Sequence, residues 1–214
     1  MADNFKERFS QAVKETETVV YSYLPEETGH QKTIFEAMNY SVKAGGKRLR
    51  PLLMREVYRL FGGNGPEIEP FMAAMEMIHT SSLIHDDLPC MDNDEYRRGK
   101  LTTWKAYGYD MAVLAGDALM IYAFETASKA FSMGADPAKV GRAIGILAEK
   151  TGIYGMIGGQ TVDVELTGKA VPREKLDFIY RLKTGALLEA SMMIGAVLAG
   201  ATVEEIKEVE TMAS

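Results

Sequence analysis

The sequence has 214 residues but only one cysteine, Cys90, and it has fewer basic than acidic side chains. One cysteine excludes a scaffold built on disulfides within the chain. Lys and Arg number 24 against 30 Asp and Glu, and the resulting net charge of -6 disfavours general affinity for nucleic acid. Local clusters of basic residues therefore require a smaller anionic partner, such as a phosphorylated small molecule.

Long apolar runs are also missing from the sequence. No uninterrupted run reaches the length of about 18 residues that a membrane-spanning helix needs. The longest candidate, residues 190–203, is broken by glycines, and it predicts a buried core helix rather than a membrane span. The first residues lack the apolar core of a secretory signal, so we predict a cytoplasmic location.

Strand-like alternation is absent as well, and helical spacing of apolar residues prevails. With 47% hydrophobic residues, the chain has enough apolar side chains for one sizeable core. The pattern predicts one all-α domain over residues 1–214, a helical bundle that carries its functional carboxylates inwards. The predicted helices cover residues 5–24, 33–44, 51–61, 70–88, 111–131, 136–166, 171–197 and 202–209.

One helical stretch ends in clustered acids. Residues one and two turns apart on a helix share a face, so His79, Ser82 and Asp86 are predicted to line one wall of a pocket. Asp87 follows directly, Pro89 disfavours further helix, and Asp92 returns to the same end. The spacing therefore predicts that three carboxylates gather there.

Gathered carboxylates repel one another unless a cation lies between them. Oxygen ligands of this kind suit Mg²⁺, which keeps waters and also takes phosphate oxygens from a substrate. Arg97 and Arg98 follow closely and offer forked, permanently charged donors for further phosphate oxygens. The pattern indicates a magnesium-dependent diphosphate site on Asp86, Asp87 and Asp92.

A second basic cluster follows Gly45 and Gly46 at the start of a predicted helix. Lys47, Arg48 and Arg50 place positive charge where the helix dipole opposes it, and a bound anion would relieve that conflict. A solvated basic turn explains the same residues equally well. A nucleotide-binding P-loop is excluded, because the residue after Lys47 is Arg48 rather than Ser or Thr.

Taken together, these motifs resemble those of trans-prenyl diphosphate synthases. The first aspartate-rich motif of that family is similar to Asp86 to Asp92 with Arg97 and Arg98, and the residues from Gly45 to Pro51 resemble its isopentenyl diphosphate site. Later landmarks follow in the expected order and bring the resemblance to almost the whole chain. They are residues 114–119, Gly158 to Gln160 with Asp163, and Lys183 with Thr184.

The resemblance implies an isoprenoid-synthase-type bundle and head-to-tail condensation of isopentenyl diphosphate with an allylic prenyl diphosphate. It assigns isopentenyl diphosphate to Lys47, Arg50, His79 and Arg98. The allylic diphosphate is assigned to Arg97, Lys183 and Thr184, with Gln160 facing the same pocket. Catalysis is expected to depend on Asp86, Asp87, Asp92 and Lys183, whereas His85 is expected to be structural.

In this family a bulky residue one turn before the first Asp limits the length of the product. Ser81 and Ser82 are small, so we expect geranylgeranyl diphosphate or a similar product, which Ser81→Phe would shorten. The family's second aspartate-rich motif is not found in these 214 residues, so we expect a domain truncated at its C-terminus with negligible turnover alone.

Two other functions remain open at this level. A non-catalytic regulatory subunit that binds a full-length synthase would not need Lys47, Arg50 and the three aspartates, and a terpene cyclase would not need residues 45–51. We also expect a homodimer.

Overall fold

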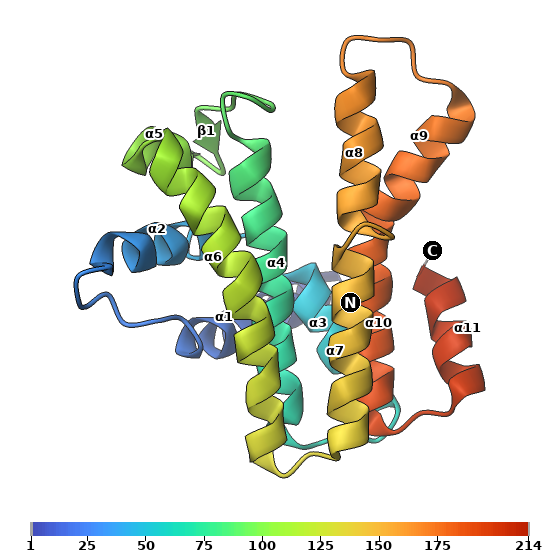
Figure 1. The fold of residues 1–214 in the computed structure, drawn as a ribbon. Coiled ribbons are helices and arrows are strands. Elements are labelled where there is room, and N and C mark those ends of the chain that lie inside the picture. The colour runs from blue at the N-terminus through green and yellow to red at the C-terminus, as the bar shows by residue number, and fades with distance from the viewer. Residues whose placement is uncertain (1, 214) are drawn as a thin grey trace.

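The structure, a computed structural model, describes residues 2–213, and almost all of its regular elements are helices (Figure 1). In chain order the elements are α1 (Ala2–Ser22), α2 (Lys32–Val42), α3 (Leu49–Leu60), η1 (Pro66–Ile68), α4 (Glu69–Asp86), β1 (Tyr96–Arg97), β2 (Lys100–Leu101), α5 (Thr103–Tyr107), α6 (Tyr109–Ser128), η2 (Lys129–Met133), α7 (Pro137–Thr151), α8 (Met156–Leu166), α9 (Arg173–Ile179), η3 (Tyr180–Gly185), α10 (Ala186–Ala199) and α11 (Val203–Ala213). The predicted all-α class is confirmed.

Helix α4 is the centre of the fold because it is apolar on nearly every side. Phe71, Met75 and Ile78 are completely buried in it, and α1, α2, α3 and α6 all pack against it. A helix that is hydrophobic all round is stable only when other elements cover it. The packing around α4 therefore fixes the position of its last turn, which contains Asp86.

Helix α10 ties the second half of the chain to the first by packing on α3, α7 and α11. Gly195 makes the contact with α3 unusually close, because a Cβ at this position would lie only 2.4 Å from the carbonyl oxygen of Met54. In Figure 1, α8 and α9 project beyond the other helices as a pair. α8 follows α7 after the loop Gly152–Gly155, and α9 continues through η3 into α10.

Three local features differ from the predicted helices. The helix predicted over 136–166 is two helices, α7 and α8, separated at Gly152–Gly155. A short antiparallel hairpin pairs Tyr96 with Leu101 and Arg97 with Lys100, and its turn residues Arg98 and Gly99 both have positive φ. Such a turn matches the twist of two short strands. The third feature is η3, a π-helical turn between α9 and α10.

By length and composition alone, two continuous helical stretches would be able to cross a membrane, Tyr109–Met133 and Arg173–Ala199. Core helices of soluble proteins pass the same test, and 61% of the 18-residue apolar window in the second stretch is buried in this fold. The absence of a membrane span therefore stays a prediction.

Candidate active site

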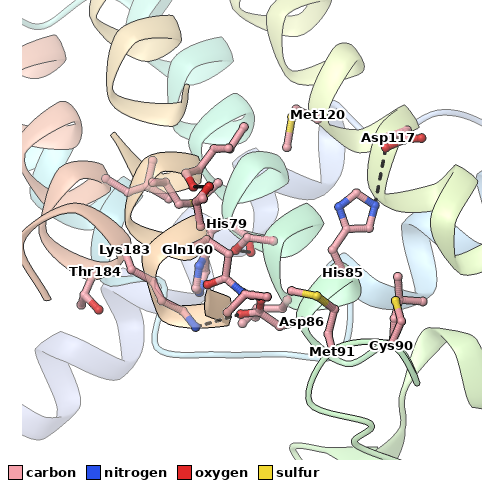
Figure 2. Close-up of a pocket in the computed structure, with 18 of the residues that line it drawn as sticks. His79, His85, Asp86, Cys90, Met91, Asp117, Met120, Gln160, Lys183 and Thr184 are labelled. Atoms are coloured by element: carbon pink, nitrogen blue, oxygen red, sulfur yellow. Dashed lines mark hydrogen bonds and ion pairs between the residues drawn. The ribbon is translucent and has the colours of Figure 1, made fainter. Parts of the chain in front are cut away.

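A cavity of about 740 Å³ lies where α4, α6, α8 and the start of α10 meet. Its walls are largely apolar, with Val113 and Met120 from α6, Met156 and Ile157 from α8, and Leu187 from α10. Polar side chains gather around the end of α4, where Figure 2 shows Asp86, Gln160 and Lys183 close together. The cavity thus joins an apolar interior to a group of charged residues.

Asp86 is the carboxylate that faces this cavity. Gln160 donates a hydrogen bond from Nε2 to its Oδ1 at 2.7 Å, and the Nζ of Lys183 lies 3.8 Å from its Oδ2. Burial raises the pKa of Asp86, the charge of Lys183 opposes this effect, and the charge of Asp92 adds to it. The ionised form of Asp86 is therefore poorly compensated and would gain from a cation.

Asp87 points away from the cavity and is already paired. Arg97, returned by the hairpin, donates from Nε and Nη2 to the buried Asp87 carboxylate at 2.6–3.0 Å. Asp92 is exposed, and its backbone N–H donates to the carbonyl oxygen of Asp86. Among the described residues, no three His, Cys, Asp or Glu side chains are arranged to hold a metal ion. The predicted gathering of three carboxylates is therefore not preformed, since Arg97 neutralises one of them.

The second charged group at the cavity is Lys183. Its Nζ donates to Oδ2 of Asp163 at 2.6 Å, in addition to its contact with Asp86. Burial acts to lower the pKa of Lys183, but the hydrogen bond with Asp163 and the charge of Asp86 raise it overall. Thr184 also lines the cavity and is exposed. Sequence reasoning places Lys183, Thr184 and Gln160 at one site, and the structure brings them together.

A smaller basic pocket of about 500 Å³ lies beside the cavity, lined by Lys47, Arg50, His79 and Arg98 among others. Nη1 of Arg50 lies 3.5 Å from Nε2 of His79, and the Nε of Arg50 is buried with no hydrogen-bond partner among the described residues. Burial and the neighbouring charges of Arg50 and Arg98 lower the pKa of His79 to about 3. His79 is therefore neutral, and an anion would compensate the surrounding cations.

Gly46 and Arg98 shape this pocket together. Arg98 donates from Nη1 to the carbonyl oxygen of Gly45, and its guanidinium lies against Gly46, where a Cβ would be 2.9 Å from Nη1. Gly46 also has a φ of +145°, which favours glycine. The glycine pair thus brings Arg98 onto the turn that carries Lys47.

Arg48 differs from its neighbours because its side chain is completely buried. Its guanidinium donates to Glu76 at 2.7 Å, to the Tyr21 hydroxyl at 3.1 Å and to the carbonyl oxygen of Val42 at 2.8 Å. Its backbone is left-handed, with a φ of 49°. Arg48 is therefore a structural residue that anchors the turn between α2 and α3, and no feature of the sequence distinguishes it from Lys47 or Arg50.

The cavity and the basic pocket share two residues, Arg50 and His79, which line both. The two spaces are thus neighbours with a common wall. An apolar chain with an anionic end group fits the first space, and a small anion fits the second. The geometry allows two anionic ligands to lie side by side.

The structure adds detail on two residues of α4, His85 and Ser81. His85, expected to be structural, lines the cavity, and its Nε2 lies 3.3 Å from the carbonyl oxygen of Val113 and 3.6 Å from Oδ1 of Asp117. Ser81 is completely buried and does not line the cavity, whereas Ser82 does. The 100° rotation between successive residues of a helix turns Ser81 toward the core.

The all-α fold and the paired pockets define a class, the helical isoprenoid synthases, and two solved structures support it. One is an FPP/GFPP synthase from Zymomonas mobilis, with TM-score 0.91, 37% identity and coverage of 100% of this chain and 77% of that one. The other is a geranyltransferase from Legionella pneumophila, with TM-score 0.89, 33% identity and coverage of 97% and 73%. The polyprenyl synthetase family model matches residues 31–214, so the chain belongs to that family.

Curated relatives agree with this assignment. The chain is 49% identical over 181 residues to the chloroplastic geranylgeranyl pyrophosphate synthase of Capsicum annuum, covering 84% of this chain and 49% of that protein. It is 41% identical to the farnesyl diphosphate synthase of Geobacillus stearothermophilus, covering 100% and 72%. The chain spans about half the length of the plant relatives it matches.

Proposed function

We propose that this chain binds isopentenyl diphosphate and an allylic prenyl diphosphate and belongs to an enzyme that condenses them head to tail. Geranylgeranyl diphosphate is the first choice of product. The observation that carries the proposal is the shared wall of Arg50 and His79 between an apolar cavity and a basic pocket. The allylic chain would occupy the cavity, and isopentenyl diphosphate would occupy the basic pocket.

Three aspartates are proposed to hold Mg²⁺. Hard carboxylate oxygens suit this ion. The raised pKa of Asp86, caused first by burial and only partly offset by the charge of Lys183, supports a cation at this carboxylate. Asp86, Asp87 and Asp92 would hold the metal, with Arg97 releasing Asp87. When bound, Mg²⁺ supplies positive charge that stabilises the departing diphosphate.

The side chains have separate tasks in the proposed reaction. Lys183, Thr184 and Arg97 hold the allylic diphosphate, and Gln160 fixes the Asp86 carboxylate. Arg50, Lys47 and Arg98 hold isopentenyl diphosphate with neutral His79 at their side. The allylic C–O bond breaks, the double bond of isopentenyl diphosphate attacks the allylic carbon, and the departing diphosphate takes the proton that is lost. Apolar walls keep water away from the cationic carbon.

Calorimetric titration tests this arrangement. With Mg²⁺ present, we expect Lys183→Met to weaken binding of farnesyl diphosphate and Lys47→Met to weaken binding of isopentenyl diphosphate, each by about tenfold or more, because each removes a charged contact. Arg59→Met, on the exposed face of α3, is the control. Failure of the wild-type chain to bind either ligand would contradict the proposal.

The remaining expectations stay predictions. They are the single domain, negligible turnover of these residues alone, the homodimer and the cytoplasmic location. Several relatives are named chloroplastic, so a plastid is an equally direct proposal for the location. Mixing with a full-length synthase and measuring mass by light scattering distinguishes the regulatory-subunit alternative from independent binding of the substrates.

A further inference from the structure

Lys183, which lines the cavity together with a second cation, Arg50, lies in an unusual piece of backbone. Tyr180–Gly185 form a π-helical turn between α9 and α10, and Lys183 lies within it. π-helical turns are rare and are frequent at functional sites, because they aim side chains in directions that a regular α-helix does not provide. The position of this turn therefore decides where the Lys183 ammonium reaches.

Gly159 in α8 lies directly against this turn. A Cβ at Gly159 would be 2.4 Å from the backbone nitrogen of Lys183 and 2.9 Å from the carbonyl carbon of Leu182. Both distances are below the 3.0 Å that real Cβ contacts respect, and backbone atoms cannot swing aside as a side-chain tip can. Only glycine allows α8 and the turn to approach this closely.

This contact aligns two side chains on one carboxylate. Gln160, the next residue of α8, donates to one oxygen of Asp86, and Lys183 lies 3.8 Å from the other oxygen. The neighbouring Gly158 has a different reason to be glycine, since a Cβ there would lie 2.2 Å from the carbonyl oxygen of Ile153 in the preceding loop. Gly159 alone of this pair approaches the backbone of Lys183.

We propose that Gly159 is a positioning residue, which sets the π-helical turn at the distance from α8 that places Lys183 beside Asp86. The inference rests on the proposed function in one respect only, namely that Lys183 holds the diphosphate of the allylic substrate. The position of Lys183 itself can be measured without any ligand.

A zero-length carbodiimide cross-link between Lys183 and Asp86, mapped by mass spectrometry and quantified separately from the cross-link to Asp163, whose Oδ2 lies 2.6 Å from the Lys183 Nζ, reports the proximity of Lys183 to Asp86 in the ligand-free chain. We expect the cross-link in the wild type and its loss in Gly159→Ala. Gly145→Ala is the matched control, because this exposed glycine of α7 has nothing within 4 Å of its Cβ position. A folded Gly159→Ala chain that cross-links at the wild-type yield overturns the proposal.

If circular dichroism shows that Gly159→Ala does not fold, Gly159→Ala/Leu182→Gly replaces it, because it removes the Leu182 Cβ that lies 2.9 Å from the Cβ position of Gly159 and gives the backbone of the turn more freedom to adjust. Leu182→Gly is its control. Loss of the cross-link in the double variant alone supports the proposal, and equal yields in both overturn it.

Binding of inorganic pyrophosphate with Mg²⁺ adds a second readout. We expect Gly159→Ala as a single substitution to weaken pyrophosphate binding. Added to Lys183→Met, it should weaken binding no further, since Gly159 acts through Lys183. If the losses of binding free energy caused by Gly159→Ala and by Lys183→Met are additive in the double variant, the proposal is overturned. A wild-type chain that does not bind pyrophosphate contradicts the proposed function, while the cross-link still decides the role of Gly159.

Discussion

Ser82 is a small residue of α4 that lines the cavity. It lies one turn before Asp86, so a phenylalanine there would fill space that a growing chain needs. We expect Ser82→Phe to weaken binding of geranylgeranyl diphosphate relative to geranyl diphosphate by about tenfold or more in calorimetric titrations, as a steric block implies.

Ser81→Phe is the matched control for this prediction. Ser81 is completely buried among core residues, so the larger ring should destabilise the fold by about 1–3 kcal/mol without changing chain-length preference. Equal discrimination by the two variants would contradict the geometry. The sequence singles out this pair of positions, but it cannot say which one faces the cavity, because that depends on how α6 and α8 lie around α4.

The neutral state of His79 links stability to pH. Its pKa in the folded chain is lowered, first by burial and then by Arg50, to about 3, against an ordinary value of 6.5. Between these values the unfolded chain binds a proton that the folded chain does not. The effect of neutral His79 on the free energy of unfolding is therefore at its full favourable value above pH 6.5. Below pH 6.5 the free energy of unfolding falls as the pH decreases, by at most about 1.4 kcal/mol per pH unit.

Urea unfolding at pH 7 and pH 5 measures this contribution. We expect His79→Gln to lose less stability between the two pH values than the wild type does. His30→Gln, at an exposed position, should retain the wild-type difference. Identical pH dependence in His79→Gln and the wild type would show that His79 does not stay neutral.

At the scale of helices, Arg48 joins three elements through one buried side chain. It contacts α1 through Glu17 and Tyr21, the end of α2 through Val42, and α4 through Glu76. Removing one partner of a buried ion pair costs about 3–5 kcal/mol, because the other charge remains buried and unpaired. We therefore expect Arg48→Met to lower the free energy of unfolding by about this amount.

Two further variants check the cause of that loss. Arg48→Met/Glu76→Leu should recover most of the stability, since no buried charge is left. Arg59→Met removes an ion pair with Glu56 in which both side chains are more than half exposed, and it should cost about 1 kcal/mol or less. A double variant as unstable as Arg48→Met would refute the explanation.

Helix positions are the part of the fold that the sequence predicts best. Apolar spacing locates α1, α2, α4 and α6 within a few residues, and Asp136 caps α7 as its type and the following proline predict, accepting a hydrogen bond from the N–H of Ala138. The break before α8 and the π-helical turn are not visible in periodicity. Both depend on close backbone contacts at Gly155 and Gly159, which only the packed helices reveal.

At the scale of the whole molecule, the candidate site joins segments that are distant in sequence. Asp86, Gln160 and Lys183 meet through the packing of α4, α8 and the π-helical turn. The resemblance to trans-prenyl diphosphate synthases implies that these residues share a site, and in the structure their side chains lie close together. The pairing of Asp87 with Arg97 was not predictable from spacing, because the left-handed turn at Arg98 and Gly99 reverses the chain and returns Arg97 to α4.

Substitution of Asp86 tests whether the folded chain needs a bound cation beside this carboxylate. Burial raises the pKa of Asp86, so its ionised form opposes folding when no metal is bound, and Asp86→Asn should leave the melting temperature of the ligand-free chain unchanged or higher.

Saturating Mg²⁺ and pyrophosphate, at about 100 times the dissociation constant, should raise the wild-type melting temperature by roughly 5–10 °C. We expect Asp86→Asn to abolish this rise, and Asp177→Asn, on the exposed side of α9, to retain it. If the melting temperature of Asp86→Asn rises as much as that of the wild type, pyrophosphate binds elsewhere. If Asp86→Asn is less stable than the wild type without ligand, the contacts with Gln160 and Lys183 already compensate the carboxylate.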